Sequence, residues 1–102
     1  MVNMKKFESV IILRPTLKKT EIKEIVKKAD DAIERVADII EKEELGLKKL
    51  AYEIKGEKEG YYVSHKFDMK KEIDNYADSV GSIEIYFKTQ EEIIKFIVVK
   101  RD

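Results

Sequence analysis

Side chains that carry most enzyme chemistry are scarce in this sequence of 102 residues. It has no cysteine and one histidine, His65, which lies in an alternating run typical of a strand. Nucleophilic catalysis needs an activated serine, cysteine or lysine beside a base, and the base needs a partner that orients it. A lone histidine within a strand is usually a packing or surface residue, so we predict that the protein is not an enzyme.

Acidic residues and glycines do not form a recognisable ligand site either. The carboxylates of the run Glu41–Glu44 alternate between the two faces of a predicted strand, so they do not converge on a metal ion. The four glycines match no phosphate-binding loop. The segment Arg14–Lys19 also lacks the anion-binding glycines that small acylphosphatases carry after their first strand. We therefore predict no metal site, no cofactor and no small-molecule substrate.

One segment, Gly46–Val63, combines apolar residues with lysines and tyrosines: GLKKLAYEIKGEKEGYYV. It spans two predicted antiparallel strands, Asp38–Ile54 with a bulge at Gly46 and Glu59–Met69, joined by KGEKEG, whose glycines permit positive φ. Lysines contact phosphates without sequence preference, and tyrosine stacks on an unpaired base or on a partner chain. We expect Leu50, Tyr52, Ile54, Tyr61 and Val63 to fold the hairpin toward the core, and Lys49, Lys55, Lys58 and Tyr62 to be available for binding.

The charge balance argues against RNA binding by electrostatics alone. Charged residues make up 41% of the chain but cancel to a net charge of zero. The hydrophobic fraction of 43% is enough for one globular domain, residues 1–102. The apolar run near the N-terminus, Val10–Leu13, is too short for a signal peptide or a membrane span. Together with the lack of cysteine, this predicts a cytoplasmic protein.

Hydrophobic periodicity predicts the other elements. Lys5–Leu13 and Glu92–Lys100 have the β-branched and aromatic residues of strands. Lys18–Val36 has apolar residues at steps of three and four, typical of an amphipathic helix that Thr16 or Thr20 caps. Lys70–Gln90 is ambiguous: Ser82–Phe87, SIEIYF, alternates like a strand, but Ile73, Tyr76, Ala77 and Val80 have helical spacing. We predict that this segment is helical overall, with a break near Gly81. The order βαββαβ predicts an α+β, ferredoxin-like fold with two helices on one face of a four-stranded antiparallel sheet.

The other face of that sheet is left open and carries a predicted apolar patch. In the first and last strands, which are neighbours in this topology, the alternation places Val10, Ile12, Ile97 and Val99 away from the helices. An apolar patch with a polar rim usually marks a contact surface. A slip of one residue in this face assignment would dissolve the patch. Its expected rim consists of Lys49, Tyr62, Lys66 and Lys95.

The segment LGLKKLAYEIKGEKEGYYV resembles a pattern of one family, Gly-x-(Arg/Lys)-(Arg/Lys)-Leu-Ala-Tyr-x-Ile followed by Gly-x-Tyr. That family is the sixth protein of the bacterial small ribosomal subunit. KKFESVIILRP and IEIYFKTQEEIIKFIVVK are similar to its opening and closing runs, with Lys95 where arginine is usual. The resemblance covers nearly the whole chain and implies the same βαββαβ fold.

The resemblance also implies a function: a structural constituent of the small ribosomal subunit that binds its RNA together with the small, basic eighteenth protein of that subunit. Such a partner would supply the positive charge that this chain lacks. Members of the family often continue into a tail that contacts the partner; here Asp102 ends the sequence, so we expect the sheet to supply more of the interface. When free, the protein is expected to be a monomer. The residues assigned to RNA are Lys5, Phe7, Lys49, Lys55, Lys58, Tyr62 and Lys95, and those assigned to the partner protein are Val10, Ile12, Tyr62, Ile97 and Val99.

Two alternatives use the same fold. Gly60–Val63 is faintly similar to the aromatic third-strand motif of a stand-alone RNA-recognition module, although Glu59 replaces the basic residue expected before the glycine. A ferredoxin-like enzyme or regulatory domain is the other alternative, because the fold does not determine the function.

Overall fold

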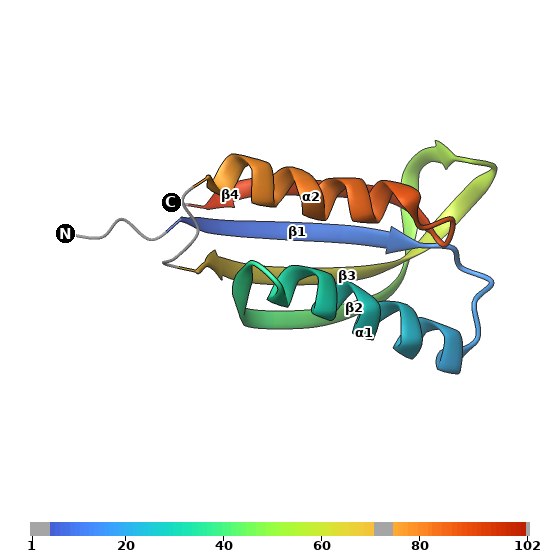
Figure 1. Cartoon of the computed structure of the whole chain (residues 1–102). Helices are drawn as coiled ribbons and strands as arrows, with labels where there is room; N and C mark the ends of the chain where they lie inside the picture. The colour runs from blue at the N-terminus through green and yellow to red at the C-terminus, as the bar shows by residue number, and fades with distance from the viewer. Residues whose placement is uncertain (1–4, 71–74, 102) are drawn as a thin grey trace.

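Two helices lie side by side on one face of a four-stranded antiparallel sheet (Figure 1). The computed structural model describes residues 5–70 and 75–101. The strands are ordered β2-β3-β1-β4, so the first and last strands of the chain are neighbours, and the ferredoxin-like prediction is confirmed. The elements are β1 (Lys6–Leu13), α1 (Lys19–Glu34), β2 (Ala37–Ile54), β3 (Glu57–Met69), α2 (Tyr76–Thr89) and β4 (Ile93–Arg101).

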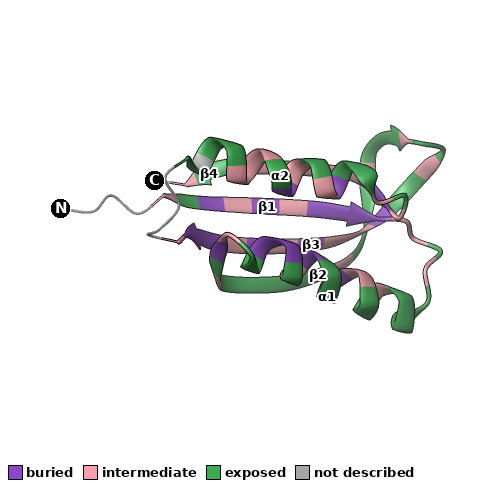
Figure 2. Cartoon of the chain, in the orientation of Figure 1, coloured by how far each residue is buried: buried purple, intermediate pink, exposed green. Residues whose placement is uncertain are grey.

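The core lies between the helices and the sheet, and Figure 2 shows it as buried stripes along β1 and β3 and on the inner sides of the helices. Strand alternation produces these stripes, because every second side chain of β1 and β3 points toward the helices. Burial of this apolar surface is the main stabilising contribution to the fold. Its fully buried members, all below 2% exposure, include Ile11, Leu13, Ile33, Val63, Phe67, Ile83 and Phe87.

The start of α1 differs from the prediction. The helix begins at Lys19, so its N-cap residue is Lys18. Thr16 lies two residues before the N-cap, and Thr20 already lies inside the first turn. Neither threonine caps the helix. Instead, the Glu21 carboxylate accepts a hydrogen bond of 2.9 Å from the backbone N–H of Lys18, which satisfies one of the donors that a helix leaves free at this end.

The predicted break in the second helix is wrong, because α2 continues through Gly81 without interruption. Ile83 and Phe87, four residues apart, are both buried, whereas Ile85 between them is 65% exposed. That is helical spacing, so the apparent alternation of SIEIYF is coincidental. The part of the predicted segment at residues 71–74 lies outside the described residues.

The β2–β3 hairpin is longer and more tightly turned than predicted. Its turn consists of Lys55 and Gly56 alone, with φ of 49° and 82°, the combination of a two-residue turn with both central residues in the left-handed region. Glu57 and Lys58, which precede the predicted strand, already belong to β3. In Figure 1 the end of this hairpin, in green and yellow, turns away from the direction of the other strands.

Irregular pairing accounts for that turn of direction. The β2–β3 register shifts between Ile39 and Glu41, between Glu44 and Gly46, and between Lys49 and Ile54. Gly46 has φ of 83°, so the predicted bulge there is confirmed. Bulges bend a strand and increase its twist, and the far half of the hairpin therefore leaves the plane of the sheet.

Candidate protein and RNA interface on the open sheet face

Cross-strand pairing places the predicted apolar residues on one face. Val10 pairs with Ile97 of β4, and Ile12 pairs with Lys95. Since directly opposite residues share a face, the assignment of these side chains away from the helices is confirmed. Across β3, β1 and β4 the open face consists of four rows: Tyr62, Ile12 and Lys95; Ser64, Val10 and Ile97; Lys66, Glu8 and Val99; and Asp68, Lys6 and Arg101.

The hairpin covers one end of this face. Ile12 was predicted to be exposed, but it is only 6% exposed because the hairpin bends over it. A Cβ at Gly60 would overlap Ile12 Cγ2, so this close approach requires a glycine. By contrast, Ile97 and Val99 are each 49% exposed, and Val10 is half-buried. The patch thus has a covered end and an open end.

A groove of about 220 Å³ lies between the hairpin and the sheet. The expectation that Leu50, Tyr52 and Ile54 point into the core is wrong, because the bulges of β2 carry them over the open face. Only Tyr61 and Val63 of that set pack in or against the core. The groove is lined mainly by apolar side chains of the sheet and hairpin, among them Val10, Ile12, Leu50, Ile54, Tyr62 and Ile97.

Two pairs of lysine and tyrosine border the groove. Lys95 Nζ donates a 2.9 Å hydrogen bond to the Tyr52 hydroxyl and lies 5.2 Å from the centre of its ring. This hydrogen bond lowers the pKa of Tyr52. Lys48 Nζ lies 5.9 Å from the ring centre of Tyr62. Contacts of this kind between an ammonium and an aromatic face are attractive, so the first pair ties the hairpin to β4.

The residues predicted to bind RNA are only partly brought together. Lys49, Lys55 and Lys58 are exposed on the hairpin, and Tyr62 is partly exposed beside it. Lys5 lies at the other end of β1, where the backbone carbonyl accepts a bond of 2.8 Å from the Met69 N–H. The hairpin lysines are therefore a local cluster to which Lys5 does not belong.

The assignment of Phe7 to RNA is not compatible with its position. Its ring is 7% exposed and stacks on Phe67 in the core, with 6.0 Å between the ring centres. Phe7 occupies the inward set of β1, whereas a base would have to stack on the open face. The ring is therefore a core residue.

Polar contacts close the end of the open face away from the hairpin. Arg101 Nε donates to the Phe7 carbonyl at 2.9 Å, and Arg101 Nη2 donates to Asp68 Oδ1 at 3.0 Å. Lys66 and Glu41 form an ion pair of 3.5 Å. Arg101 and Tyr52 were both missed as contributors to this surface; Arg101 lies one residue beyond the predicted strand, and Tyr52 was assigned to the opposite face.

His65 is buried, as expected of a packing residue. It is 0% exposed, and its Nε2 lies 2.6 Å from Asp30 Oδ1, while Lys42 Nζ donates to Asp30 Oδ2 at 2.8 Å. Burial lowers the pKa of His65, and the Asp30 carboxylate acts in the opposite direction. The ring of His65 is therefore not exposed to solvent.

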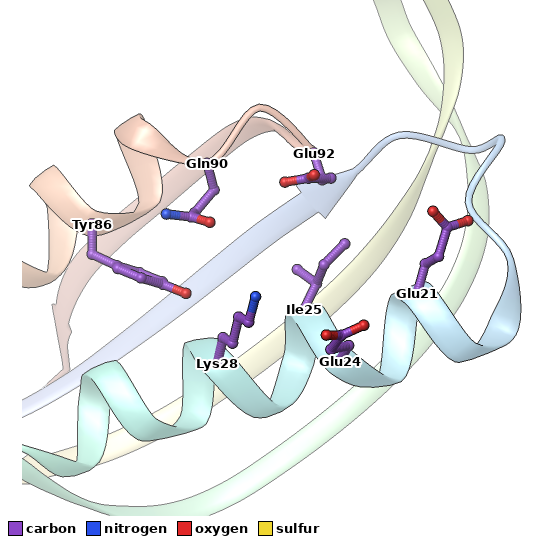
Figure 3. A pocket seen from close by; sticks show the side chains of 7 residues that line it. All are labelled: Glu21, Glu24, Ile25, Lys28, Tyr86, Gln90 and Glu92. Carbon is purple, nitrogen blue, oxygen red and sulfur yellow. The ribbon is translucent and has the colours of Figure 1, made fainter.

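A second pocket, of about 170 Å³, lies between the helices (Figure 3). Tyr86, Gln90 and Glu92 line one side of it, and α1 lines the other. Burial raises the pKa of Tyr86. The carboxylates here include Glu21, which already caps α1. Within residues 5–70 and 75–101, no three side chains of histidine, cysteine, aspartate or glutamate are placed so that they could hold a metal ion together.

The helices in the described part of the chain are all too short or too polar to cross a membrane.

Comparison with known proteins supports the fold and the resemblance. Residues 6–100 match the family model described as Ribosomal protein S6. The chain is 37% identical over 100 residues to the small ribosomal subunit protein bS6 of Christiangramia forsetii, covering 97% of this chain and 84% of that protein. It is 41% identical over 102 residues to the protein of the same name from Phytoplasma australiense, covering 95% and 99%. The crystal structure of 30S ribosomal protein S6 from Thermotoga maritima superposes with a TM-score of 0.86 and 26% identity, covering 97% of this chain and 89% of that one.

Proposed function

The chain belongs to the ribosomal protein S6 family, and from this premise we propose that it binds small-subunit ribosomal RNA jointly with the basic eighteenth protein of that subunit, which is seated on the open sheet face. Membership makes it a non-enzymatic component of the small subunit, and so a protein of the cytoplasmic ribosome. The proposal concerns which surfaces of the protein contact the RNA and the partner protein in the small subunit.

The observation that carries the proposal is the open end of the apolar patch. Ile97 and Val99 are each 49% exposed, and Ile97 also lines the groove beneath the hairpin. In a chain with 41% charged residues, an apolar surface bordered by lysines and tyrosines is typical of a protein contact. The eighteenth protein would bury this surface and add the positive charge that a net-neutral chain lacks.

The RNA is proposed to contact the hairpin. Lys49, Lys55 and Lys58 are exposed there, and lysines neutralise phosphates without reading the bases. Glu53 and Glu59 lie beside Lys49 and Lys58 around a shallow pocket and reduce the local charge. Because these glutamates offset part of the lysine charge, the three lysines alone should bind RNA weakly. Weak binding is consistent with a protein that needs a partner to bind RNA tightly.

The stand-alone RNA-recognition module is less compatible with this sheet. Such modules stack two or three bases on aromatic side chains of the open face. Of the aromatic residues in β1 and β3, only Tyr62 lies on that face, because Phe7, Tyr61 and Phe67 point toward the helices.

Two exposed isoleucines provide a matched test. Ile97→Asp changes the open face, and Ile85→Asp changes the outer side of α2, where the side chain is 65% exposed. Both variants should fold, with unfolding free energies changed by about 0.5 kcal/mol or little more. In a titration with the eighteenth protein, Ile97→Asp should lose more than about tenfold in affinity, since a charge must then be desolvated at the contact. Equal affinities for the two folded variants would exclude the open face as the interface.

A further inference from the structure

The order of the charged residues along helix α1 is unfavourable for the helix dipole. Its N-terminal part, residues 18–28, has five lysines and two glutamates, whereas residues 29–34 have three acidic side chains and no basic one. The last turn has no basic residue. A helix is positive at its N-terminus and negative at its C-terminus, so it favours the reverse arrangement. Helix stability therefore does not explain this charge order.

Three of the lysines form a row. Lys19, Lys23 and Lys27 are spaced four residues apart, so they follow one side of the helix with a rise of about 6 Å between neighbours. All three are exposed. Like charges four residues apart in a helix repel each other, so the row is a second unfavourable feature of the same element.

Two acidic residues of α1 have structural partners in the described residues, whereas the lysine row forms no ion pair there. Asp30 binds both His65 and Lys42, and Glu21 caps the helix. Among the ion pairs within 4.0 Å in the described residues, none involves Lys19, Lys23 or Lys27. The fold thus explains the positions of Asp30 and Glu21, but it does not explain the positions of these lysines.

We propose that Lys19, Lys23 and Lys27 form a second RNA-binding surface that contacts the phosphate backbone of ribosomal RNA. Charge complementarity identifies the ligand, because a line of unpaired point charges on a ribosomal protein suits a polyanion with regularly repeated charges. The helices cover the face of the sheet opposite the open one (Figure 1). RNA on the lysine row would therefore meet the helical layer, whereas the hairpin lysines and the proposed partner site lie on or beside the open sheet face. The protein would link two RNA segments.

The absence of cysteine allows a direct test in assembled small subunits. An iron chelate that generates hydroxyl radicals is attached through Thr20→Cys, an exposed position beside the row, or through Glu59→Cys, an exposed position on the hairpin. We expect both probes to cleave ribosomal RNA, at different segments. If the chelate at Thr20→Cys cleaves no RNA, or cleaves only a neighbouring protein, while the chelate at Glu59→Cys cleaves RNA, the second surface is excluded and the proposed function stands. Loss of cleavage from Glu59→Cys alone would instead count against the RNA contact of the hairpin.

A charge reversal supplies the energetic test. Lys23→Glu replaces two repulsive pairs by two attractive ones, so the melting temperature of the free protein should rise. In complex with the eighteenth protein and small-subunit RNA, the same variant should reduce the slope of log affinity against log salt by about 0.7 to 0.9, the value for one lost phosphate contact. The control, Lys88→Glu on α2, should leave that slope unchanged, since this exposed lysine lies outside the row. An unchanged slope for a folded Lys23→Glu or Lys23→Gln variant would overturn the proposal.

Discussion

His65 joins three elements through one carboxylate. It lies in β3, its partner Asp30 lies in α1, and Lys42 of β2 binds the other oxygen of the same carboxylate. The neutral ring donates from Nε2, which leaves Nδ1 buried without a hydrogen-bond partner in the described structure. A second proton would have to enter at this desolvated nitrogen, and burial therefore dominates the lowered pKa of His65.

This arrangement predicts a loss of stability in weak acid. The pKa of His65 is lowered on folding from its ordinary value of 6.5, so the unfolded chain takes up the proton first as the pH falls. The stability that comes from keeping His65 neutral is fully present above pH 6.5. Below pH 6.5 the free energy of unfolding falls by at most about 1.4 kcal/mol per pH unit. Urea unfolding of the wild type and of His65→Gln between pH 7.5 and 5 measures this loss. Because glutamine still donates to Asp30 but does not titrate, the variant should have the flatter profile; parallel profiles would contradict the assignment.

The sequence predicted which face of the sheet a side chain lies on better than it predicted how exposed that side chain is. Val10, Ile12, Ile97 and Val99 share one face, as alternation requires, but Ile12 is covered by a hairpin that alternation does not describe. The inward position of Phe7 follows from the same alternation, whereas its assignment to RNA came from family resemblance.

At the scale of elements, the four strands and α1 were predictable from periodicity, with bounds within two residues of the observed ones. Periodicity left α2 ambiguous, because Ser82–Phe87 also alternates like a strand. The path of the β2–β3 hairpin was not predictable from the sequence. It depends on three register shifts in β2, of which only the one at Gly46 has a sequence signal. The other two arise from pairing with β3, a tertiary property, and together they carry Leu50 and Tyr52 over the open face.

Two glycines in different elements should respond oppositely to the same change. Gly81 lies inside α2, and a Cβ there would meet nothing within 4 Å, so Gly81→Ala should stabilise the protein by about 0.5–1 kcal/mol. Gly60→Ala should destabilise it by about 1–3 kcal/mol, because the new methyl group overlaps Ile12. Urea unfolding of both variants checks the pair. A destabilised Gly81→Ala would mean that the helix does bend there.

The whole molecule is a neutral body with its proposed contacts on two layers, the open sheet face with its hairpin and the helical layer. The open sheet face presents an apolar surface beside the hairpin lysines, and α1 presents a lysine row on the helical side. No net charge draws the protein to RNA, so local clusters and a basic partner must supply the attraction. The fold could be predicted because it follows from local periodicity. The partner could not be derived from the residues, because a contact surface records where a protein binds but not which protein.

The most direct test of this account is the affinity of the protein for small-subunit ribosomal RNA, measured at one fixed salt concentration with and without the eighteenth protein. The protein alone should bind weakly, and the pair should bind more than about tenfold tighter, a gain of about 1.4 kcal/mol. Ile97→Asp should remove that gain, since it disrupts the proposed seat of the partner. If the protein alone binds the RNA as tightly as the pair does, the central claim that RNA binding depends on a partner on the open sheet face is wrong.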